Sequence, residues 1–465
     1  MSRLKDCRLD RDALPVSILS QLFIFRNSVR QRSLHISGIG LTAERIRTMI
    51  AIIFVLAAIP LGVFTSGGMP TYRIIVPAVI LMQLYLIRCF RNVQMLMILT
   101  LYLQIYFLYL VPYFYFGIEL SQYSEFQNPV YFGKIAFLFY LFYTGLVCSA
   151  CKPFNPSRIA LCRLIRITTP RYKQVLYLLF LFVALGLVLR QGQNVLTAEV
   201  DSYGVYIENL DNTNSLPLFY ILFLIIGHYV IADWRWRKLL TVVLIVMLTG
   251  YCVTRGFRMI LAPTGLLIFM LFVDQRIRTR TVLLLFGLGF VALILVNSLK
   301  MSLSFSLDGM FSEGQHDYIV AHHADNLYVA AAGMGMLDSG SIAFFDRVLL
   351  NLGFLAETII PPGTLPDALK YPHLITHTVS TGGGGLFVMG AYLMWGYVGI
   401  CIFGFLLGEF VRRTYQYRKP LLAIICAILM VFAPRWISYD FHIILRFTFL
   451  AFVIYLLLCP PRKFS

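Results

Sequence analysis

The sequence predicts an all-α, polytopic integral membrane protein with about twelve membrane-spanning helices and one large extracytoplasmic loop. Three observations support this fold class. Hydrophobic residues make up 59% of the 465 positions and charged residues only 13%, with a mean hydropathy of +0.77. Apolar runs of about 18 or more residues recur along the whole chain, which is the length a helix needs to cross a bilayer. The alternating strand pattern of an outer-membrane barrel is absent.

Twelve apolar segments are expected to cross the membrane. They are residues 48–67, 73–88, 93–116, 130–150, 173–190, 216–232, 238–254, 257–273, 281–300, 385–409, 420–436 and 441–459. The charge distribution orients them, because lysine and arginine are enriched in short cytoplasmic loops. If the N-terminus is cytoplasmic, the inner segments hold 29 of the 39 Lys and Arg residues. We therefore expect a basic cytoplasmic segment at 1–47, a transmembrane domain at 48–459 and a cytoplasmic tail at 460–465.

Charge and cysteine content exclude other classes. The net charge of +17 is explained by these anchoring loops, so nucleic-acid binding is not expected. The nine cysteines lie in or beside apolar segments or in basic loops, which indicates no disulfide framework. The C-x-x-C stretch at Cys148 and Cys151 is interpreted as helix-end packing. The apolar stretch Ala13–Phe25 is followed by no small-residue cleavage site and predicts an amphipathic helix on the inner surface.

Two arginines stand between the seventh and eighth predicted spans, in the stretch "TRGFRM". Arg255 and Arg258 are expected on the outer side, against the positive-inside trend. If a helix starts near Gly256, its unpaired backbone N–H groups and its dipole favour an anion there. Guanidinium groups add paired donors that match phosphate oxygens. We predict a site for a lipid-linked phosphate or pyrophosphate; the alternative is anchoring to lipid headgroups.

The outer segment 301–384 is too long to be a simple connector. Five of the eight histidines lie in it, at His316, His322, His323, His373 and His377. The stretch "HHADN" at 322–326 concentrates groups that can accept a proton from a hydroxyl near neutral pH. His322, His323 and Asp325 are therefore candidate general bases, and the alternative is a polar loop that happens to be rich in histidine. A metal site is not expected, because the spacing matches no zinc or two-metal motif.

A glycine run precedes the tenth predicted span. The four glycines of Thr381–Gly385 let the backbone approach a ligand closely or turn sharply into the helix, and the alternative is a flexible hinge. His377 beside them is a further candidate catalytic residue. Arg347 and Arg435 also fall on the outer side and are candidates for binding phosphate oxygens. For Arg435, the alternative is an ion pair with Asp440 or contact with a headgroup.

These features resemble the bacterial oligosaccharide repeat-unit polymerases of the Wzy type. The matching residues are Leu248–Phe272, the large late outer loop, and Gly382–Arg413, which contains "GAYLMWGYVGI". The resemblance covers roughly residues 170–450. It implies a membrane glycosyltransferase of the GT-C-like type, which joins lipid-linked sugar repeats at the outer face of the bacterial inner membrane. The growing chain would pass from undecaprenyl pyrophosphate to the non-reducing-end sugar of a new lipid-linked repeat.

The resemblance also implies roles for the candidate residues. The leaving pyrophosphate would be held by arginines, from the set Arg255, Arg258, Arg347 and Arg435. The acceptor hydroxyl would lose its proton to one of His322, His323, Asp325 and His377, with inversion of the anomeric centre. Because the leaving group is a lipid pyrophosphate, neither a nucleotide sugar nor a metal or other cofactor is expected. The expected partners are undecaprenyl-pyrophosphate-linked oligosaccharide, the membrane and, as an open question, a chain-length regulator protein.

Two alternatives remain open. An O-antigen ligase would share the architecture and the donor but use a lipid A–core acceptor. The loop 301–384 has two basic and eight acidic residues, which favours a polymerase over a ligase with an anionic acceptor. A lipid-oligosaccharide transporter would need no chemistry, but the chain shows neither two similar halves nor mid-membrane binding charges clearly.

Overall fold

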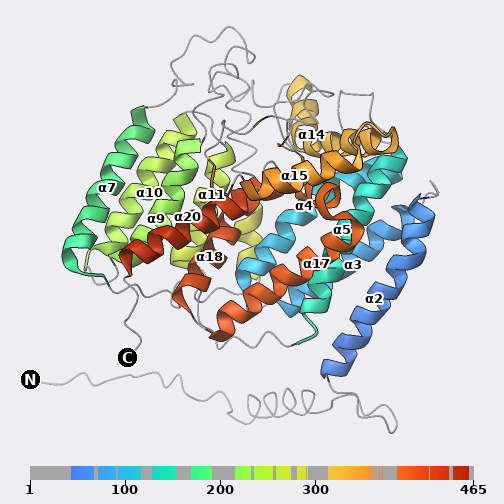
Figure 1. Cartoon of the computed structure of the whole chain (residues 1–465), viewed down its shortest axis with the longest axis horizontal. Coiled ribbons are helices and arrows are strands. Elements are labelled where there is room, and N and C mark those ends of the chain that lie inside the picture. Colours follow the sequence, from blue (N-terminus) through green and yellow to red (C-terminus); the bar gives the residue numbers. More distant parts are fainter. Residues whose placement is uncertain are drawn as a thin grey trace, which may run out of the picture.

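Every regular element in the described part of the chain is a helix (Figure 1). The computed structural model describes residues 43–66, 72–90, 93–116, 128–152, 169–190, 215–231, 235–254, 258–273, 280–289, 291, 313–356, 358–360, 366, 369, 385–417, 419–438 and 443–459. The predicted amphipathic helix at 13–25, the basic segment up to residue 42 and the tail 460–465 lie outside these ranges. No part of the loop 191–214 is described either.

The described helices follow one another along the chain. They are α2 (Ala43–Ser66), α3 (Tyr72–Cys89), α4 (Gln94–Phe116), α5 (Pro129–Ser149), α7 (Arg171–Arg190), α9 (Ser215–Val230), α10 (Arg237–Thr254), α11 (Arg258–Ile268) continued by the π-helix η1 (Phe269–Val273), α14 (Glu313–Asp338), α15 (Phe344–Ala356), α17 (Phe387–Tyr417), α18 (Pro420–Val431), α19 (Ala433–Ser438) and α20 (Ile443–Leu458). A further apolar helix spans Arg280–Gly289.

Six of the described helices, α2, α3, α5, α7, α10 and α17, are long and apolar enough to cross a membrane. Five more apolar helices are shorter, and each of the twelve predicted spans overlaps a described helix. The prediction of an all-α, multi-pass membrane protein is therefore confirmed, whereas the number of crossings stays a prediction. Three boundaries differ clearly from expectation. Helix α2 begins at Ala43 rather than at residue 48, α17 continues past residue 409 to Tyr417, and a turn at Phe432 divides the eleventh segment into α18 and α19.

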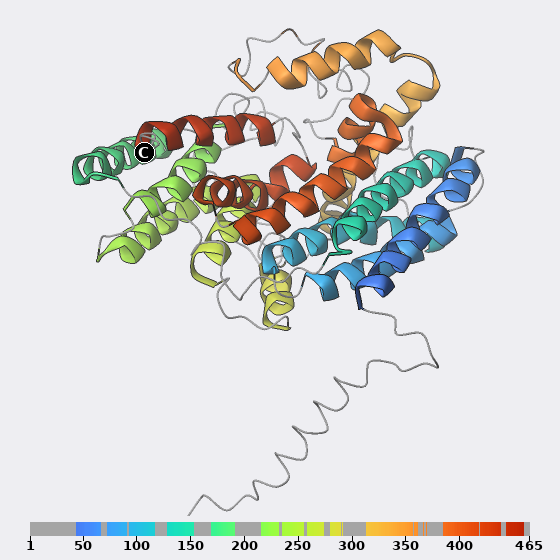
Figure 2. The same cartoon turned by 60° about the horizontal axis from the view of Figure 1, so that its bottom comes forward.

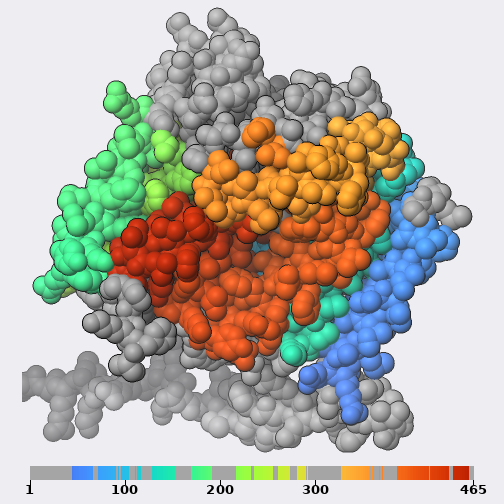
Figure 3. All heavy atoms as spheres, in the orientation of Figure 1, coloured from blue at the N-terminus to red at the C-terminus, as the bar shows by residue number. Residues whose placement is uncertain are grey.

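The helices form two groups joined by α17, α18 and α19 (Figure 1). In one group, α2, α3 and α4 pack around α5; in the other, α7, α10, α11 and α20 pack around α9. Figure 2 shows the same arrangement from a second side, with α14 and α15 together at one end of the bundle. In the space-filling view, α15 lies across the surface of the molecule beside α17 (Figure 3).

The peripheral helices present apolar side chains outward, as expected for contact with lipid. Ile59 on α2, Val183 on α7 and Val246 on α10 are all more than 60% exposed. By contrast, 83% of the apolar window of α5 is buried inside the protein. Two fully buried aromatic residues of α5 contact different neighbours: Phe139 packs on Phe387 of α17, and Tyr140 packs on Phe54 of α2. Helix α5 is therefore the centre of its group.

The backbones of α5 and α17 approach each other closely because small residues meet at their contact. A methyl group added at Gly145 would overlap the carbonyl oxygen of Cys401 and lie 2.7 Å from the backbone nitrogen of Phe405. One added at Gly404 would overlap the carbonyl oxygen of Phe142, and one added at Gly408 would overlap the Ser149 hydroxyl. Gly145 and Ser149 on one helix and Gly404 and Gly408 on the other are each four residues apart, which is the small-xxx-small pattern of close membrane-helix pairs.

Replacement of Gly404 by alanine is expected to destabilise the protein by about 1–3 kcal/mol, because the contact is already filled. The measurement is the unfolding temperature of detergent-purified protein, followed by intrinsic fluorescence. Gly186→Ala on α7 is the matched control, since a methyl group there meets no atom within 4 Å. Equal losses of stability in the two variants would contradict the proposed importance of the α5–α17 contact.

Candidate functional site

The short helix α19, which carries Arg435, is held in place by a buried tryptophan. Helix α18 ends at Val431, and a new helix starts at Ala433 with Pro434 in its first turn, where a missing N–H costs nothing. Trp436 is fully buried and its Nε1 donates to the Leu429 carbonyl at 2.8 Å. Its ring also packs edge-on against Phe387 of α17, with 5.3 Å between ring centroids. The half-buried Arg435 is thus presented by a fixed backbone.

The end of α19 is bonded to two other elements. The Ser438 carbonyl accepts a hydrogen bond from the backbone N–H of Gly385, at 3.2 Å. The Ser438 hydroxyl lies 3.1 Å from the hydroxyl of Tyr102 on α4. Gly385 is the last residue of the glycine run and directly precedes α17, so this one residue of the run lies beside the end of α19. The residues 381–384 and His377 lie outside the described part of the chain.

The helices on either side of "TRGFRM" are separated by only three residues, as expected for a short connection. Helix α10 ends at Thr254 and α11 begins at Arg258, slightly later than the start predicted near Gly256. Helix α11 packs directly against α19, and also against α9, α10 and α18. The helix that opens with Arg258 therefore contacts the helix that carries Arg435. Arg255 and the side chain of Arg258 are not among the described parts of the structure.

The stretch "HHADN" lies in a helix rather than in a loop. His322, His323 and Asp325 are backbone positions in the middle of α14, and their side chains are outside the description. The next residue, Asn326, is only 4% exposed, and Leu327 to Ala332 are buried as well. Helix α14 packs on α4, α5 and α17. The motif therefore lies directly before the part of α14 that is packed into the helix bundle.

The far end of α14 is fixed to the start of α5. The Lys134 ammonium group lies 2.6 Å from the Asp338 carboxylate, and the Lys134 side chain is largely buried. One turn earlier, Gly335 lies against the ring of Tyr131, which a Cβ at Gly335 would approach to 3.3 Å. The apolar second half of α14 is consequently part of the packed bundle, at the end where α5 begins.

Arg347 does not point to an open site; it binds the backbone at a break in α17. At Gly396 the backbone has φ 66° and ψ −169°, a conformation that favours glycine and interrupts the helix. Arg347 on α15 donates from Nε to the Leu393 carbonyl at 2.7 Å and from Nη2 to the Tyr392 carbonyl at 3.0 Å. These carbonyls lose helical partners at the break, so the guanidinium group caps the first half of α17.

Asn351 completes this cap. Its Nδ2 donates to the Met394 carbonyl at 3.1 Å, and its Oδ1 accepts from Nε1 of Trp395 at 3.0 Å. The predicted binding of pyrophosphate by Arg347 remains a prediction, but two of its donors already serve the protein backbone. Within the described ranges, no group of three His, Cys, Asp or Glu side chains is placed to hold a metal ion.

Several residues of this region carried little sequence signal. Tyr102 lies within an apolar run, and Ser438 and Asn351 stand alone in their segments. Asn326 is part of the "HHADN" stretch but is not among the candidate residues that the sequence predicts. Gly396 offered a signal, since a glycine inside a predicted span can mark a break or a close contact.

No family model, no curated protein sequence and no solved structure matches this chain.

Replacement of Arg347 by methionine is expected to destabilise the protein by about 1–3 kcal/mol, because two carbonyl groups lose their donors. Arg347→Lys should recover only part of this loss, since an ammonium group lacks the guanidinium fork. Unfolding temperatures of the purified variants provide the test, with Arg73→Met, an exposed arginine on α3, as the control. A normally stable Arg347→Met protein that loses activity would show that ligand binding, rather than capping, is the role of Arg347.

Proposed function

We propose that this protein is an inverting membrane glycosyltransferase that polymerises undecaprenyl-pyrophosphate-linked oligosaccharide repeat units at the outer face of the inner membrane. The observation that carries the proposal is the packing of α11, which opens with Arg258, against α19, which carries Arg435. This contact allows arginines far apart in sequence to act on one pyrophosphate. The resemblance of Leu248–Phe272 and Gly382–Arg413 to repeat-unit polymerases supports the same activity.

The proposed reaction follows from this arrangement. A hydroxyl of the acceptor repeat forms a bond to the anomeric carbon of the growing chain, and the bond from that carbon to the pyrophosphate oxygen breaks. Arg255, Arg258 and Arg435 stabilise the negative charge that develops on the leaving lipid pyrophosphate. His322, His323 or Asp325 on α14, or His377, takes the hydroxyl proton. Helix α14 supports this role because it is packed into the bundle immediately after this motif.

We further propose twelve crossings with both termini in the cytoplasm. Support comes from the overlap of every predicted span with a described helix and from the concentration of basic residues in alternate loops. In this orientation α14, α15 and the start of α17 lie at the outer surface. The donor and acceptor lipids would then meet the site from the leaflet in which they are displayed.

One observation favours the transporter alternative. Discontinuous membrane helices are typical of substrate and ion sites in transporters, and α17 is interrupted at Gly396. However, the carbonyls of Tyr392, Leu393 and Met394 accept hydrogen bonds from Arg347 and Asn351. These carbonyl groups therefore serve as acceptors within the protein rather than as ligands of a transported ion. The polymerase remains the better supported function.

The test of function is the surface polysaccharide of the host after deletion of the gene and complementation with variants. We expect deletion to collapse a ladder of lengths to core plus a single repeat. Arg255→Ala, Arg258→Ala and Arg435→Ala should each reproduce the collapse, since loss of one charge-stabilising donor typically lowers the rate about 100-fold or more. Arg73→Ala, an exposed arginine on α3, should restore the full ladder.

The outcome separates the alternatives when the variants are expressed at normal levels. Loss of all repeats from the core would favour the ligase or the transporter. A full ladder from all three arginine variants would exclude the proposed pyrophosphate site.

The orientation is tested with an epitope tag inserted after Gly340, in the exposed turn between α14 and α15. An antibody should bind this tag on intact spheroplasts, whereas a tag at the C-terminus should be reached only after permeabilisation. The reverse pattern would place the arginines and α14 in the cytoplasm and contradict the proposed use of an outward-facing lipid donor.

A further inference from the structure

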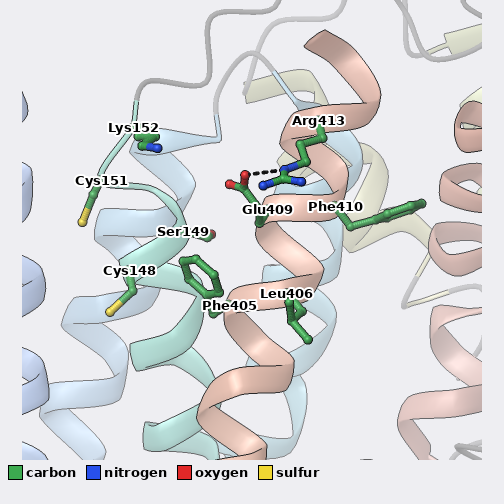
Figure 4. Close-up of a pocket in the computed structure, with 9 residues that line it drawn as sticks. All are labelled: Cys148, Ser149, Cys151, Lys152, Phe405, Leu406, Glu409, Phe410 and Arg413. Atoms are coloured by element: carbon green, nitrogen blue, oxygen red, sulfur yellow. Dashed lines mark hydrogen bonds and ion pairs between the residues drawn. The ribbon is translucent and has the colours of Figure 1, made fainter. Parts of the chain in front are cut away.

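A cavity of about 420 Å³ lies between the last turn of α5 and the second half of α17 (Figure 4). Its lining includes Cys151 and Lys152 at the end of α5 and Phe405, Leu406, Glu409 and Arg413 on α17. This volume falls in the range of about 300–1,000 Å³ found for small-molecule sites. Helix α14 contacts the start of α5, at Lys134, so the cavity lies at the opposite end of that helix from the site described above.

The wall formed by α17 is apolar and open to the side. Phe405 is 41% exposed and Leu406 is 56% exposed, on a helix long and apolar enough to span a membrane. Phe410 extends the apolar surface by one turn. Such a surface at the side of a membrane helix meets lipid acyl chains rather than water. A molecule in this cavity can therefore keep an apolar chain in the bilayer.

The rim of the cavity carries an excess of positive charge. Figure 4 shows Arg413 turned toward Glu409, and its Nε donates to the Glu409 carboxylate at 2.7 Å. Arg412 binds the same carboxylate, with 2.8 Å from its Nε to Oε2. Lys152, just beyond the end of α5, adds an ammonium group at the rim. Two arginines thus bind one carboxylate, and Lys152 adds a third positive charge to the lining of the cavity.

The geometry of Arg413 leaves donors for a further anion. Among the described residues, its hydrogen bond to Glu409 is made through Nε, so the terminal amino groups of the guanidinium remain to bind phosphate oxygens. The Cys151 thiol is directed elsewhere, to the backbone carbonyls of Arg47 and Val147. The polar recognition at this rim therefore comes from Lys152 and Arg413.

We propose that this cavity binds an anionic phospholipid, with its phosphate at Lys152 and Arg413 and one acyl chain along Phe405 and Leu406. A basic pocket between membrane helices, at the level of the headgroups, is a recurrent type of site for such lipids. A zwitterionic lipid would satisfy the apolar wall equally well but would gain less from the two cations. The inference does not depend on the polymerase reaction. In the proposed orientation, the lipid belongs to the cytoplasmic leaflet.

Native mass spectrometry of the full-length, detergent-purified protein tests the proposal. The probes are dioleoyl phosphatidylglycerol and dioleoyl phosphatidylcholine, which carry the same chains. We expect the first phosphatidylglycerol to bind more tightly than the first phosphatidylcholine. The double variant Lys152→Gln/Arg413→Gln should weaken phosphatidylglycerol binding about thirtyfold, and Lys152→Gln alone about fivefold. The single variant leaves the Glu409 ion pairs intact.

The matched control is Lys238→Gln/Arg280→Gln, which removes two exposed charges at the starts of α10 and the Arg280–Gly289 helix. It should leave the affinity for phosphatidylglycerol unchanged. If phosphatidylglycerol binding were weakened equally in the control and cavity variants, net charge alone would explain the effect, and the proposal would be overturned. Equal binding of the two lipids by the unaltered protein would overturn it as well.

Discussion

The close approach of the α5 and α17 backbones is the constraint on which the rest of the structure depends. Helices in a bilayer gain little from hydrophobic association, so their contacts rely on close van der Waals packing between small residues. Gly145 on α5 and Gly404 and Gly408 on α17 provide that packing. The α2, α3 and α14 helices then pack on α5, and α15, α18 and α19 pack on α17. Both the candidate site and the basic cavity are therefore attached to the same helix pair.

The interruption at Gly396 separates α17 into two halves that make different contacts. The second half makes the glycine contacts with α5 and forms the apolar wall of the cavity. The first half is held by Arg347 and Asn351 of α15 and by the packing of Phe387 on Trp436. It thereby connects α15 to α19, which carries Arg435. A single sequence segment thus joins two regions with different chemistry at opposite ends of the molecule.

The positions of the helices could be predicted from the sequence because each apolar run has a length set by the bilayer. The helical state of α14 could not be predicted, since it combines the polar "HHADN" with the apolar Leu327–Ala332 and has no clean helical periodicity. Its form depends on packing against α4, α5 and α17. The contact of α11 with α19 was likewise beyond prediction, because it joins residues about 175 positions apart in sequence.

The role of Arg347 illustrates the same limit at a single residue. An arginine in an outer segment suggests anion binding, and sequence alone gives no sign that its partners are backbone carbonyls. Those partners exist only because Gly396 interrupts α17, and α15 lies beside the break. The small-residue contact was more accessible, since Gly404 and Gly408 show the four-residue spacing directly in the sequence.

The capping of α17 by α15 has a consequence for the order in which the protein is made. Arg347 precedes its partner Leu393 by 46 residues, so α15 leaves the ribosome before the carbonyls that it binds. The glycine face of α5 is synthesised earlier still. At a translation rate of about 5–20 residues per second, α17 follows it only after tens of seconds. During biogenesis, α5 is therefore present for a time without α17, its main packing partner. Its insertion must be stable before α17 is available to pack against it.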